Sequence, residues 1–336
     1  MLNRRIFLKS AAVATATAGF AGLGARSAFA ANKRIALIMT GSVTDGGWNQ
    51  SAFQGLNGLK TAGGFETAYA ENVTQAKIPQ VVQGYADDGY DLIIGHGFEF
   101  GSAFLELAPQ NPKQLFFAST FKPQDKVPEN TRYVDLAYYD AAYGAGALAA
   151  LISASGKGVG FVGGGDNPTQ QRMMKCFIAG AQATRAGLTA KGIVTGDYDN
   201  AARGKEAAET LIGNGADVIW HAANVTGLGA IQGAVAGGAK VIGCYSDQSD
   251  LAPGKMATSF VLNLDWMVQQ MAKAVAAGDF KGGTEWQPKV TEMWSLKSGA
   301  GKDHDSAVVD DATWSKLLTL WKDLGDKKLD VAKLVP

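Results

Sequence analysis

Three elements meet in the stretch Arg34-Ile35-Ala36-Leu37-Ile38-Met39-Thr40-Gly41-Ser42-Val43-Thr44-Asp45-Gly46-Gly47-Trp48-Asn49-Gln50-Ser51-Ala52-Phe53. Residues 34–39 form an apolar run of strand length, and residues 50–59 carry apolar side chains at helical spacing. The loop between them therefore lies at the carboxyl end of a strand in an α/β sheet, where open sheets bind small molecules. Because this loop presents an aromatic ring, Trp48, and an amide, Asn49, the junction predicts a ligand site as well as a fold class.

Strand-length apolar runs alternate with helical patterns along the rest of the chain. Strands are expected at 34–40, 65–70, 90–95, 114–119, 158–163, 192–198, 218–222 and 240–244. Helices are expected between them, at 49–62, 75–87, 138–152, 168–185, 201–212 and 227–236. This alternation predicts parallel sheets with helices on both faces.

The strand pattern starts twice, which predicts two lobes. It restarts near Gly158, after the segment 133–150 has carried the chain away from the first set of strands. The later segments are expected to be a strand at 256–262, a helix at 265–277, a strand at 289–296 and a helix at 312–324 capped by Asp311. They indicate that the chain crosses back to the first lobe and then to the second. Three hinge crossings would make a cleft that opens and closes.

The expected domain boundaries follow from these crossings. The N-terminal lobe takes residues 31–134 and about 254–284, the C-terminal lobe takes residues 135–253 and about 285–326, and residues 327–336 form a tail. About 306 residues follow the leader, which is more than one core usually holds.

Residues 1–30 have the pattern of an export signal. Arg4-Arg5-Ile6-Phe7-Leu8-Lys9 is a twin-arginine signature, and a small-residue cleavage site, Ala28-Phe29-Ala30, follows it. Residues 10–24 are too short and too weakly apolar for a membrane anchor. The sequence therefore predicts a soluble periplasmic protein that is exported by the twin-arginine route.

Charge and cysteine content narrow the classes of partner. The leader holds four of the 31 basic residues and no acid, so 27 basic residues remain against 31 acidic ones, a formal charge of −4. No basic tract stands out, and we expect no nucleic-acid partner. Cys176 and Cys244 are expected to be buried thiols without metal-ligand spacing, and a disulfide between them is the less favoured alternative.

The common catalytic and cofactor motifs are missing from the sequence. The three histidines, His96, His221 and His304, fall in no metalloprotease pattern, and there is neither a nucleophile elbow nor a phosphate-binding loop. The glycine pattern at 158–163 resembles a dinucleotide fingerprint, but its glycines interrupt a strand and do not open a helix. We therefore predict a binding protein without catalytic residues, metal or cofactor.

A second strand end carries another aromatic side chain. The strand at 218–222 contains Trp220, and a polar turn with Asn224 follows it before the next helix. A single tryptophan at such a place is more often part of the core than a ligand contact. Paired across the two lobes, Trp48 and Trp220 instead predict a sandwich for a flat ring.

Two further loops that follow strands offer polar or charged groups. The loop at 95–100 presents His96, Phe98 and Glu99, and Glu99 is suited to hold a ligand amine or ring nitrogen. A solvated carboxylate is the commoner role for such a residue. Asp247, beyond the strand at 240–244, either hydrogen-bonds a ligand or caps the hinge.

Four motifs in order along the chain carry a family resemblance. They are Asp45-Gly46-Gly47-Trp48-Asn49-Gln50-Ser51-Ala52, Gly156-Lys157-Gly158-Val159-Gly160-Phe161-Val162-Gly163-Gly164, Thr226-Gly227-Leu228-Gly229 and Ser246-Asp247-Gln248. Together they resemble the basic membrane protein family of periplasmic substrate-binding proteins, the PnrA-like receptors of ABC importers. The resemblance implies a type I periplasmic-binding fold with two Rossmann-like lobes, a purine nucleoside or related ligand in the cleft, and a membrane permease as partner. It also implies that Trp48, Asn49 and Trp220 meet the base.

The sequence departs from this family at two positions. Tyr245 stands where an aspartate is usual and Leu262 where a lysine is usual, and the resemblance implies ribose contacts for both positions. Removing one partner of a buried ion pair costs about 3–5 kcal/mol, whereas replacing both partners can be neutral. We therefore expect an apolar ribose half that Tyr245 partly fills, and a purine base of the adenine, hypoxanthine or guanine type as the ligand.

Three alternatives stay open from the sequence. The pocket still holds purine nucleosides through other groups, the protein is an exported nucleoside hydrolase with Asp45, Glu99 or Asp247 as general base, or it is a receptor for a sugar or signalling molecule. The absence of a nucleophile–base arrangement in the sequence weighs against the hydrolase.

Overall fold

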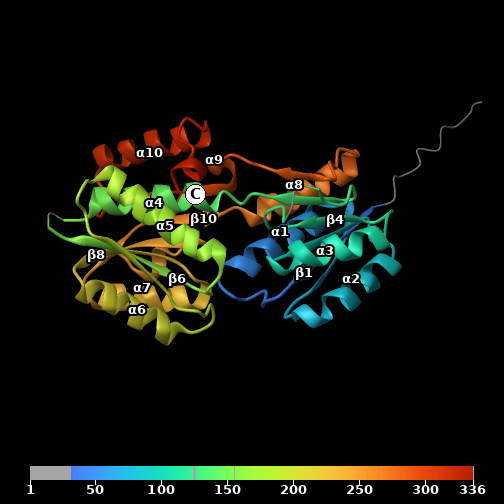
Figure 1. Cartoon of the computed structure of the whole chain (residues 1–336), viewed down its shortest axis with the longest axis horizontal. Helices are drawn as coiled ribbons and strands as arrows, with labels where there is room; N and C mark the ends of the chain where they lie inside the picture. The colour runs from blue at the N-terminus through green and yellow to red at the C-terminus, as the bar shows by residue number, and fades with distance from the viewer. Residues whose placement is uncertain (1–31, 124–125, 155, 336) are drawn as a thin grey trace, which may run out of the picture. The chain divides into compact units, whose positions relative to one another are not determined.

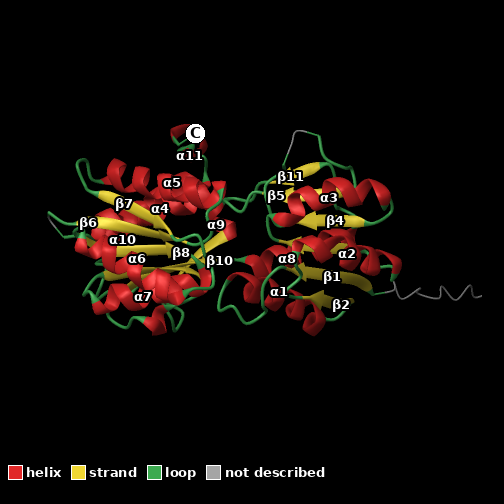
Figure 2. Cartoon of the chain, turned by 60° about the horizontal axis from the view of Figure 1, so that its bottom comes forward, coloured by secondary structure: helices red, strands yellow, loops and turns green. Residues whose placement is uncertain are grey.

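Two six-stranded sheets form the framework of the protein. The computed structural model describes residues 32–123, 126–154 and 156–335, so the predicted leader at 1–30 lies outside the described residues. The first sheet has the strand order β11-β5-β4-β3-β1-β2, and the second has the order β12-β10-β9-β8-β6-β7. All pairs of the first sheet are parallel, and in the second sheet β10 and β12 are the one antiparallel pair among the described strands. Figure 2 shows these strands in yellow with helices packed on them.

The first sheet and its helices come from two parts of the chain. The N-terminal part supplies β1 Lys33–Met39, α1 Trp48–Ala62, β2 Phe65–Ala70, η1 Gln75–Lys77, α2 Ile78–Asp87, β3 Leu92–His96, α3 Glu99–Gln110, β4 Leu115–Ala118 and β5 Thr131–Val134. A later part adds α8 Leu264–Ala277 and β11 Thr284–Trp286. We call this part of the fold the first lobe.

The second lobe holds the remaining elements. They are α4 Tyr138–Ile152, β6 Gly158–Gly163, α5 Pro168–Thr184, β7 Ala190–Val194, α6 Ala201–Gly213, β8 Ala216–Ala222, α7 Asn224–Ala236, β9 Lys240–Tyr245, η2 Ser249–Leu251, β10 Met256–Leu262, α9 Val290–Met293, β12 Trp294–Lys297, α10 Asp311–Gly325 and α11 Val331–Leu334. None of the helices in the described ranges is long and apolar enough to cross a membrane.

The side chains of β1 explain why helices cover both faces of the first sheet. Ile35, Leu37 and Met39 pack in a cluster with residues of α1 and α8, whereas Ala36 and Ile38 pack with residues of α2 and α3. Successive side chains of a strand point to opposite faces of the sheet. All five are fully buried, so the strand appears in the sequence as the continuous apolar run that marks a parallel sheet covered on both sides.

Small residues allow close helix packing in the second lobe. Helices α4 and α5 cover one face of its sheet, and α6 and α7 cover the other (Figure 1). A Cβ atom on Gly146 of α4 would lie 2.0 Å from the Phe177 carbonyl oxygen, and one on Gly180 of α5 would lie 2.1 Å from the Tyr143 carbonyl oxygen. These two glycines therefore let the backbones of α4 and α5 touch.

The chain passes between the sheets three times, as the sequence predicts. The crossings lie between β5 and α4, between β10 and α8, and between β11 and α9. One boundary differs from the expectation, because β10, which the sequence analysis assigned to the N-terminal lobe, pairs with β9 and β12 in the second sheet. The second crossing therefore begins after Leu262 and not near residue 254.

Three local predictions near the C-terminus need correction. The segment 289–296, expected to be one strand, begins as the short helix α9. Glu292 Oε2 accepts a hydrogen bond from the Lys289 N–H at 2.9 Å, which is the N3 half of a capping box. The N-cap of α10 is Asp310 and not Asp311, since the Asp310 side chain accepts from the Thr313 N–H. The expected tail contains α11, whose Val331 is buried.

Both cysteines are buried free thiols, as the sequence predicts. Burial raises the pKa of Cys176 to about 12. It also raises the pKa of Cys244 well above the usual value for a thiol, so both sulfur atoms stay protonated at neutral pH.

Candidate ligand-binding site

Trp48 is held at the carboxyl ends of β1 and β3 by a buried histidine. Its ring stacks on His96 with centroids 4.2 Å apart and an interplanar angle of 21°. His96 Nε2 lies 3.2 Å from the Trp48 carbonyl oxygen, so this nitrogen donates, and Nδ1 accepts from the Ser119 hydroxyl at 2.7 Å. Burial lowers the pKa of His96 to about 4. The imidazole is therefore neutral and acts as a positioning residue beneath the indole.

Asp45 organises the N-terminus of α1. Its Oδ1 accepts from the backbone N–H groups of Gly47 and Gln50, and its Oδ2 accepts from both the backbone and the side-chain amide of Asn49. Gly47, the N-cap residue, has no side chain to do this, so Asp45 satisfies the free N–H groups of the first turn. The Asn49 amide is thereby fixed with Nδ2 toward the carboxylate, and its buried Oδ1 has no partner among the described residues.

Glu99 begins α3 and lies next to the end of β3. A Cβ atom on Gly97 would lie 2.5 Å from Glu99 Oε2, so the carboxylate occupies space that only glycine leaves free. Oε2 is buried and has no hydrogen-bond partner among the described residues, and burial raises the pKa of this carboxyl. Phe98, its neighbour, is 66% exposed.

Aromatic rings from the hinge and the second lobe surround Trp48. Its ring centroid lies 6.1 Å from that of Tyr138, at the start of α4, and 6.1 Å from that of Tyr245, at the end of β9. Tyr245 has a backbone φ of 72° and packs in turn on Trp294 at 6.1 Å. Burial raises the pKa of both Tyr138 and Tyr245 well above the usual value, so these hydroxyls are neutral at any physiological pH.

Tyr198 is a candidate residue that the sequence analysis did not single out. It lies in the loop after β7, and its hydroxyl accepts a hydrogen bond from Asn167 Nδ2 at 3.0 Å. Burial raises the pKa of Tyr198, and interaction with Glu99 adds to that rise. Burial likewise raises the pKa of Tyr245, and interaction with Tyr198 adds to it, so Tyr198 lies near both Glu99 and Tyr245. Interaction with the Gln170 side chain offsets part of the rise in the pKa of both tyrosines.

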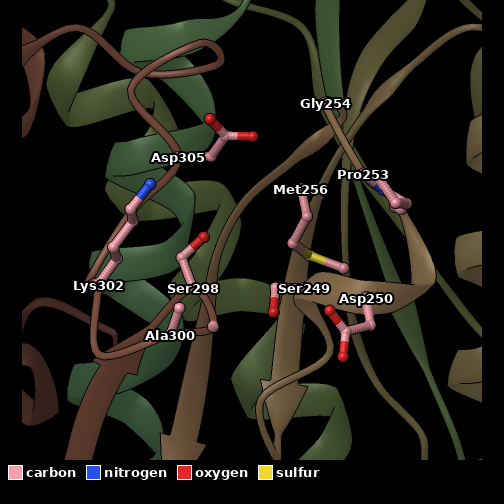
Figure 3. Close-up of a pocket in the computed structure, with 11 residues that line it drawn as sticks. Ser249, Asp250, Pro253, Gly254, Met256, Ser298, Ala300, Lys302 and Asp305 are labelled. Atoms are coloured by element: carbon pink, nitrogen blue, oxygen red, sulfur yellow. The ribbon is translucent and has the colours of Figure 1, made fainter.

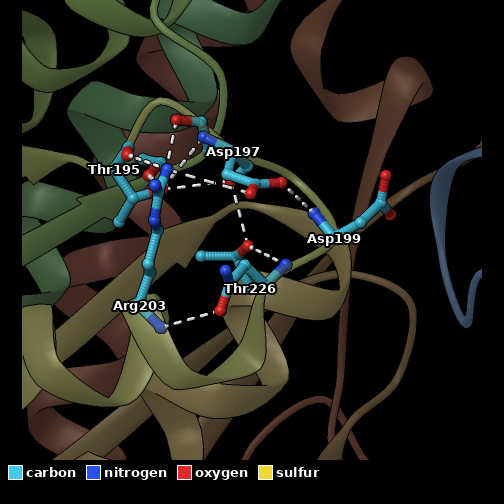
Figure 4. Close-up of polar contacts among 8 residues, drawn as sticks. Thr195, Asp197, Asp199, Arg203 and Thr226 are labelled. Carbon is cyan, nitrogen blue, oxygen red and sulfur yellow. Dashed lines mark hydrogen bonds and ion pairs between the residues drawn. The ribbon is translucent and has the colours of Figure 1, made fainter.

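A polar network fixes the loop that carries Tyr198. Thr195 Oγ1 lies 3.0 Å from both the Gly163 and the Asp197 carbonyl oxygens and can donate to either, and Thr226 Oγ1 donates to the Asp197 carbonyl oxygen at 2.9 Å (Figure 4). The Thr226 N–H, near the start of α7, donates to the Tyr198 carbonyl oxygen at 3.0 Å. Asn224 begins the same helix and is half-buried, so its predicted role in binding stays a prediction.

The predicted pairing of Trp48 with Trp220 is wrong. Trp220 is fully buried inside the second lobe, where its ring stacks on Phe177 at 5.8 Å and packs on Phe161 at 5.4 Å. Residue 220 lies within β8 and not beyond its end, and its side chain points to the face that α4 and α5 cover. The structure thus favours the core role.

Asp247 lies outside the aromatic cluster and supports loops. Its carboxylate accepts hydrogen bonds from the Ser249 N–H at 3.1 Å and the Gly299 N–H at 2.8 Å. A cavity of about 270 Å³ lies near these loops and is lined by Asp250, Lys302 and Asp305 among others (Figure 3). This cavity contains none of the predicted site residues.

The loops at the strand ends of the two lobes contact each other. Ser246 Oγ, beyond β9, donates a hydrogen bond to the Gly46 carbonyl oxygen at 2.9 Å. A Cβ atom on Gly47 would lie 3.4 Å from Tyr245 Cβ. Within the described ranges, no group of three or more histidine, cysteine or acidic side chains is placed to hold a metal ion. The site consists of aromatic rings, amides and the carboxylates of Asp45 and Glu99, and Glu99 Oε2 is buried.

Known proteins resemble this chain in sequence and in structure. Residues 32–316 match the family described as ABC transporter substrate-binding protein PnrA-like. The chain is 28% identical to the ABC transporter nucleoside-binding protein BmpA of Lactococcus lactis over 346 residues, 93% of this chain and 95% of the relative. It is 30% identical to a CD4+ T-cell-stimulating antigen of Listeria monocytogenes over 271 residues, 73% of this chain and 74% of the relative.

The fold also has solved counterparts. A solute-binding protein of an ABC transporter system from Aeropyrum pernix K1 superposes with a TM-score of 0.76 and 19% sequence identity, over 89% of this chain and 92% of that one. This likeness confirms the predicted two-lobed periplasmic-binding fold.

Proposed function

We propose, because this chain belongs to the family of PnrA-like ABC transporter substrate-binding proteins, that it is the periplasmic receptor of an ABC importer for a free purine base. In this proposal the leader at 1–30 directs export by the twin-arginine route, and the closed receptor hands its ligand to a membrane permease. Binding energy that is gained only when both lobes touch the ligand biases the protein toward its closed state.

The observation that carries the proposal is the Trp48 ring at the strand ends. It is half-buried, it rests on neutral His96, and Tyr138 and Tyr245 lie beside it. A planar base stacked on such a ring gains about 1–3 kcal/mol. Tyr198 replaces Trp220 as the second-lobe aromatic of the proposed site, because Trp220 is enclosed in the core.

A base fits this site better than a nucleoside in our proposal. Tyr245 and Leu262 are uncharged side chains and both are buried. Neither position therefore offers a charged group to a ribose hydroxyl. The nucleoside alternative rests on the Lactococcus relative, which is named a nucleoside-binding protein. A base receptor should bind each base more tightly than its nucleoside, and a nucleoside receptor should show the reverse order.

Calorimetric titration of the unliganded protein tests the proposal directly. Adenine, guanine and hypoxanthine are titrated beside adenosine, guanosine and inosine, and we expect each base to bind more tightly than its nucleoside. Tighter binding of the nucleosides would establish the alternative. Incubation with inosine checks the hydrolase alternative, because a receptor releases no hypoxanthine whereas a hydrolase does.

Replacing Trp48 with alanine separates a ligand contact from a core residue. We expect Trp48→Ala to lose measurable purine binding, because the stacking surface disappears, while the melting temperature of the unliganded protein changes little. Titration and thermal unfolding are measured on the same preparation. A large fall in the melting temperature would instead assign Trp48 to the core.

A further inference from the structure

Two buried oxygen atoms at the candidate site accept no hydrogen bond. They are Asn49 Oδ1 and Glu99 Oε2, and neither has a partner among the described residues. Buried polar atoms are nearly always paired in folded proteins. Asn49 is 5% exposed, so bulk solvent does not reach most of its side chain. At the strand ends beside the Trp48 ring, two such atoms are free to accept hydrogen bonds from a ligand.

The two oxygens belong to neighbouring strand ends. Asn49 lies over Gly41, just beyond β1, where a Cβ atom would meet its amide nitrogen at 2.4 Å. Glu99 Oε2 lies over Gly97, just beyond β3, where a Cβ atom would also lie 3.6 Å from Thr40 Oγ1. Strands β1 and β3 are adjacent and pair up to Met39 and His96. One small ligand above these strand ends can therefore reach both atoms.

Asn49 Oδ1 is able only to accept a hydrogen bond, and so is Glu99 Oε2 when the carboxyl is ionised. The Asn49 amide cannot turn its nitrogen to the ligand without breaking the 2.9 Å bond from Nδ2 to Asp45. Burial raises the pKa of Glu99, and its place in the first turn of α3 opposes that rise because a helix N-terminus favours a negative charge. A ligand that fits must present N–H or O–H groups to both positions.

We propose that these two oxygens select a purine that carries an exocyclic amino group. Glu99 Oε2 accepts a hydrogen bond from that amino group, and Asn49 Oδ1 accepts one from an N–H of the ring. Adenine and guanine meet this requirement. Hypoxanthine has no amino group, and in the orientation that suits adenine its 6-oxo group would face the Glu99 carboxylate, acceptor against acceptor. This inference rests on the proposed function and narrows its ligand from purine bases to aminopurines.

Titration of the full mature protein with adenine and hypoxanthine measures this selection. We expect the wild type to bind adenine more tightly by a factor on the order of ten or more, because a site built to bind an N–H group rejects an analogue that lacks it. In Glu99→Gln the side-chain amide can donate as well as accept. The preference for adenine should therefore shrink to about threefold or less.

The control is the same substitution elsewhere on the same helix. Glu106 is an exposed residue of α3, and Glu106→Gln should keep the wild-type preference. Melting temperatures of the unliganded variants show whether each is folded. If Glu99→Gln does not fold, Glu99→Asp, which keeps the acceptor and shortens the side chain, should retain the preference for adenine with weaker binding of both bases.

Three results would count against the inference, and they are distinguishable. Equal binding of adenine and hypoxanthine by the wild type overturns the amino-group selection and leaves the purine receptor intact. An unchanged preference in folded Glu99→Gln overturns the role of Glu99. Failure of the wild type to bind any purine overturns the proposed function itself.

Discussion

At the scale of single residues, burial separates the two tryptophans that the sequence makes look equivalent. Trp220 has no exposed surface and touches Phe161, Phe177 and Phe260, all in the second lobe. Trp48 is half-buried and lies among rings from both lobes and the hinge. The first side chain therefore contributes to folding and the second to the proposed site.

Replacing Trp220 with alanine should destabilise the protein. A fully buried tryptophan that is replaced by alanine leaves a cavity, and the cost is about 3–5 kcal/mol. Denaturant unfolding of the unliganded protein measures it, with Trp48→Ala as the matched tryptophan variant that should lose far less. Purine affinity, measured where the variant is fully folded, should stay near the wild-type value. A stable Trp220→Ala protein without purine binding would restore the sandwich that we have rejected.

The sequence predicts the position of some site residues better than their direction. Three site residues directly follow loops at strand ends, namely Trp48, Asn49 and Glu99. The order of strand, loop and helix in the sequence therefore predicts their place at the edge of the sheet. Strand β8 is buried on both faces, so no alternation of polar and apolar residues shows to which face Trp220 points. The sequence around Tyr198 gives no sign of a role in binding. The glycines on which its ring packs, Gly164 and Gly165, lie more than thirty residues earlier in the chain.

At the scale of elements, the loop after β7 is built to hold Tyr198. Thr195 bonds to the end of β6, and Thr226 bonds to the loop from the start of α7. Asp197 and Arg203 face each other across the loop with a 3.8 Å contact between Oδ2 and a guanidinium nitrogen. These three contacts fix the backbone of the loop from which Tyr198 projects.

Replacing Gly164 with alanine should displace the Tyr198 ring. A Cβ atom there would lie 2.2 Å from Cδ1 of that ring, and Gly164 has no positive φ, so the backbone itself accepts alanine. We expect purine affinity to fall about tenfold if Tyr198 supplies one stacking face. Titration measures this fall. Gly213→Ala is the matched control, because no atom lies within 4 Å of its Cβ position and helix α6 favours alanine. Equal affinities of the two variants would remove Tyr198 from the site.

The type of an element could be predicted where the apolar residues follow a clear period. The prediction failed where a local hydrogen bond competes with that period. The strand at 256–262 and the helix at 138–152 have the predicted bounds. In the segment 289–296 the apolar residues Val290, Met293, Trp294 and Leu296 resemble a strand. The hydrogen bond from the Lys289 N–H to the Glu292 carboxylate nevertheless starts a helical turn. Such a side-chain bond outweighs a short apolar pattern.

At the scale of the whole molecule, the order of crossings could be predicted and their exact places could not. In the sequence the strand pattern restarts near Gly158, and the segments after residue 256 indicate that the chain crosses back to the first lobe and then to the second. The sequence does not show which sheet accepts β10, because that strand is apolar enough for either one. Pairing with β9 and β12 settles this, and it moves the second crossing to Asn263.

A hydrogen bond between the lobes makes their closure testable. Ser246 Oγ of the second lobe donates to the Gly46 carbonyl oxygen of the first, in the loop that leads to Trp48. Since the bond exists only when the two loops touch, its loss in Ser246→Ala should favour the open form. An exposed hydrogen bond contributes about 0.5–1 kcal/mol, so the apparent purine affinity should fall about two- to fivefold. Small-angle scattering should show a larger radius of gyration for the unliganded variant, and saturating purine should restore the wild-type value.

Ser306→Ala, at an exposed loop serine, should match the wild type in both measurements. Ser246→Ala with unchanged affinity and scattering would mean that this bond forms without affecting closure, and that the ligand alone holds the lobes together.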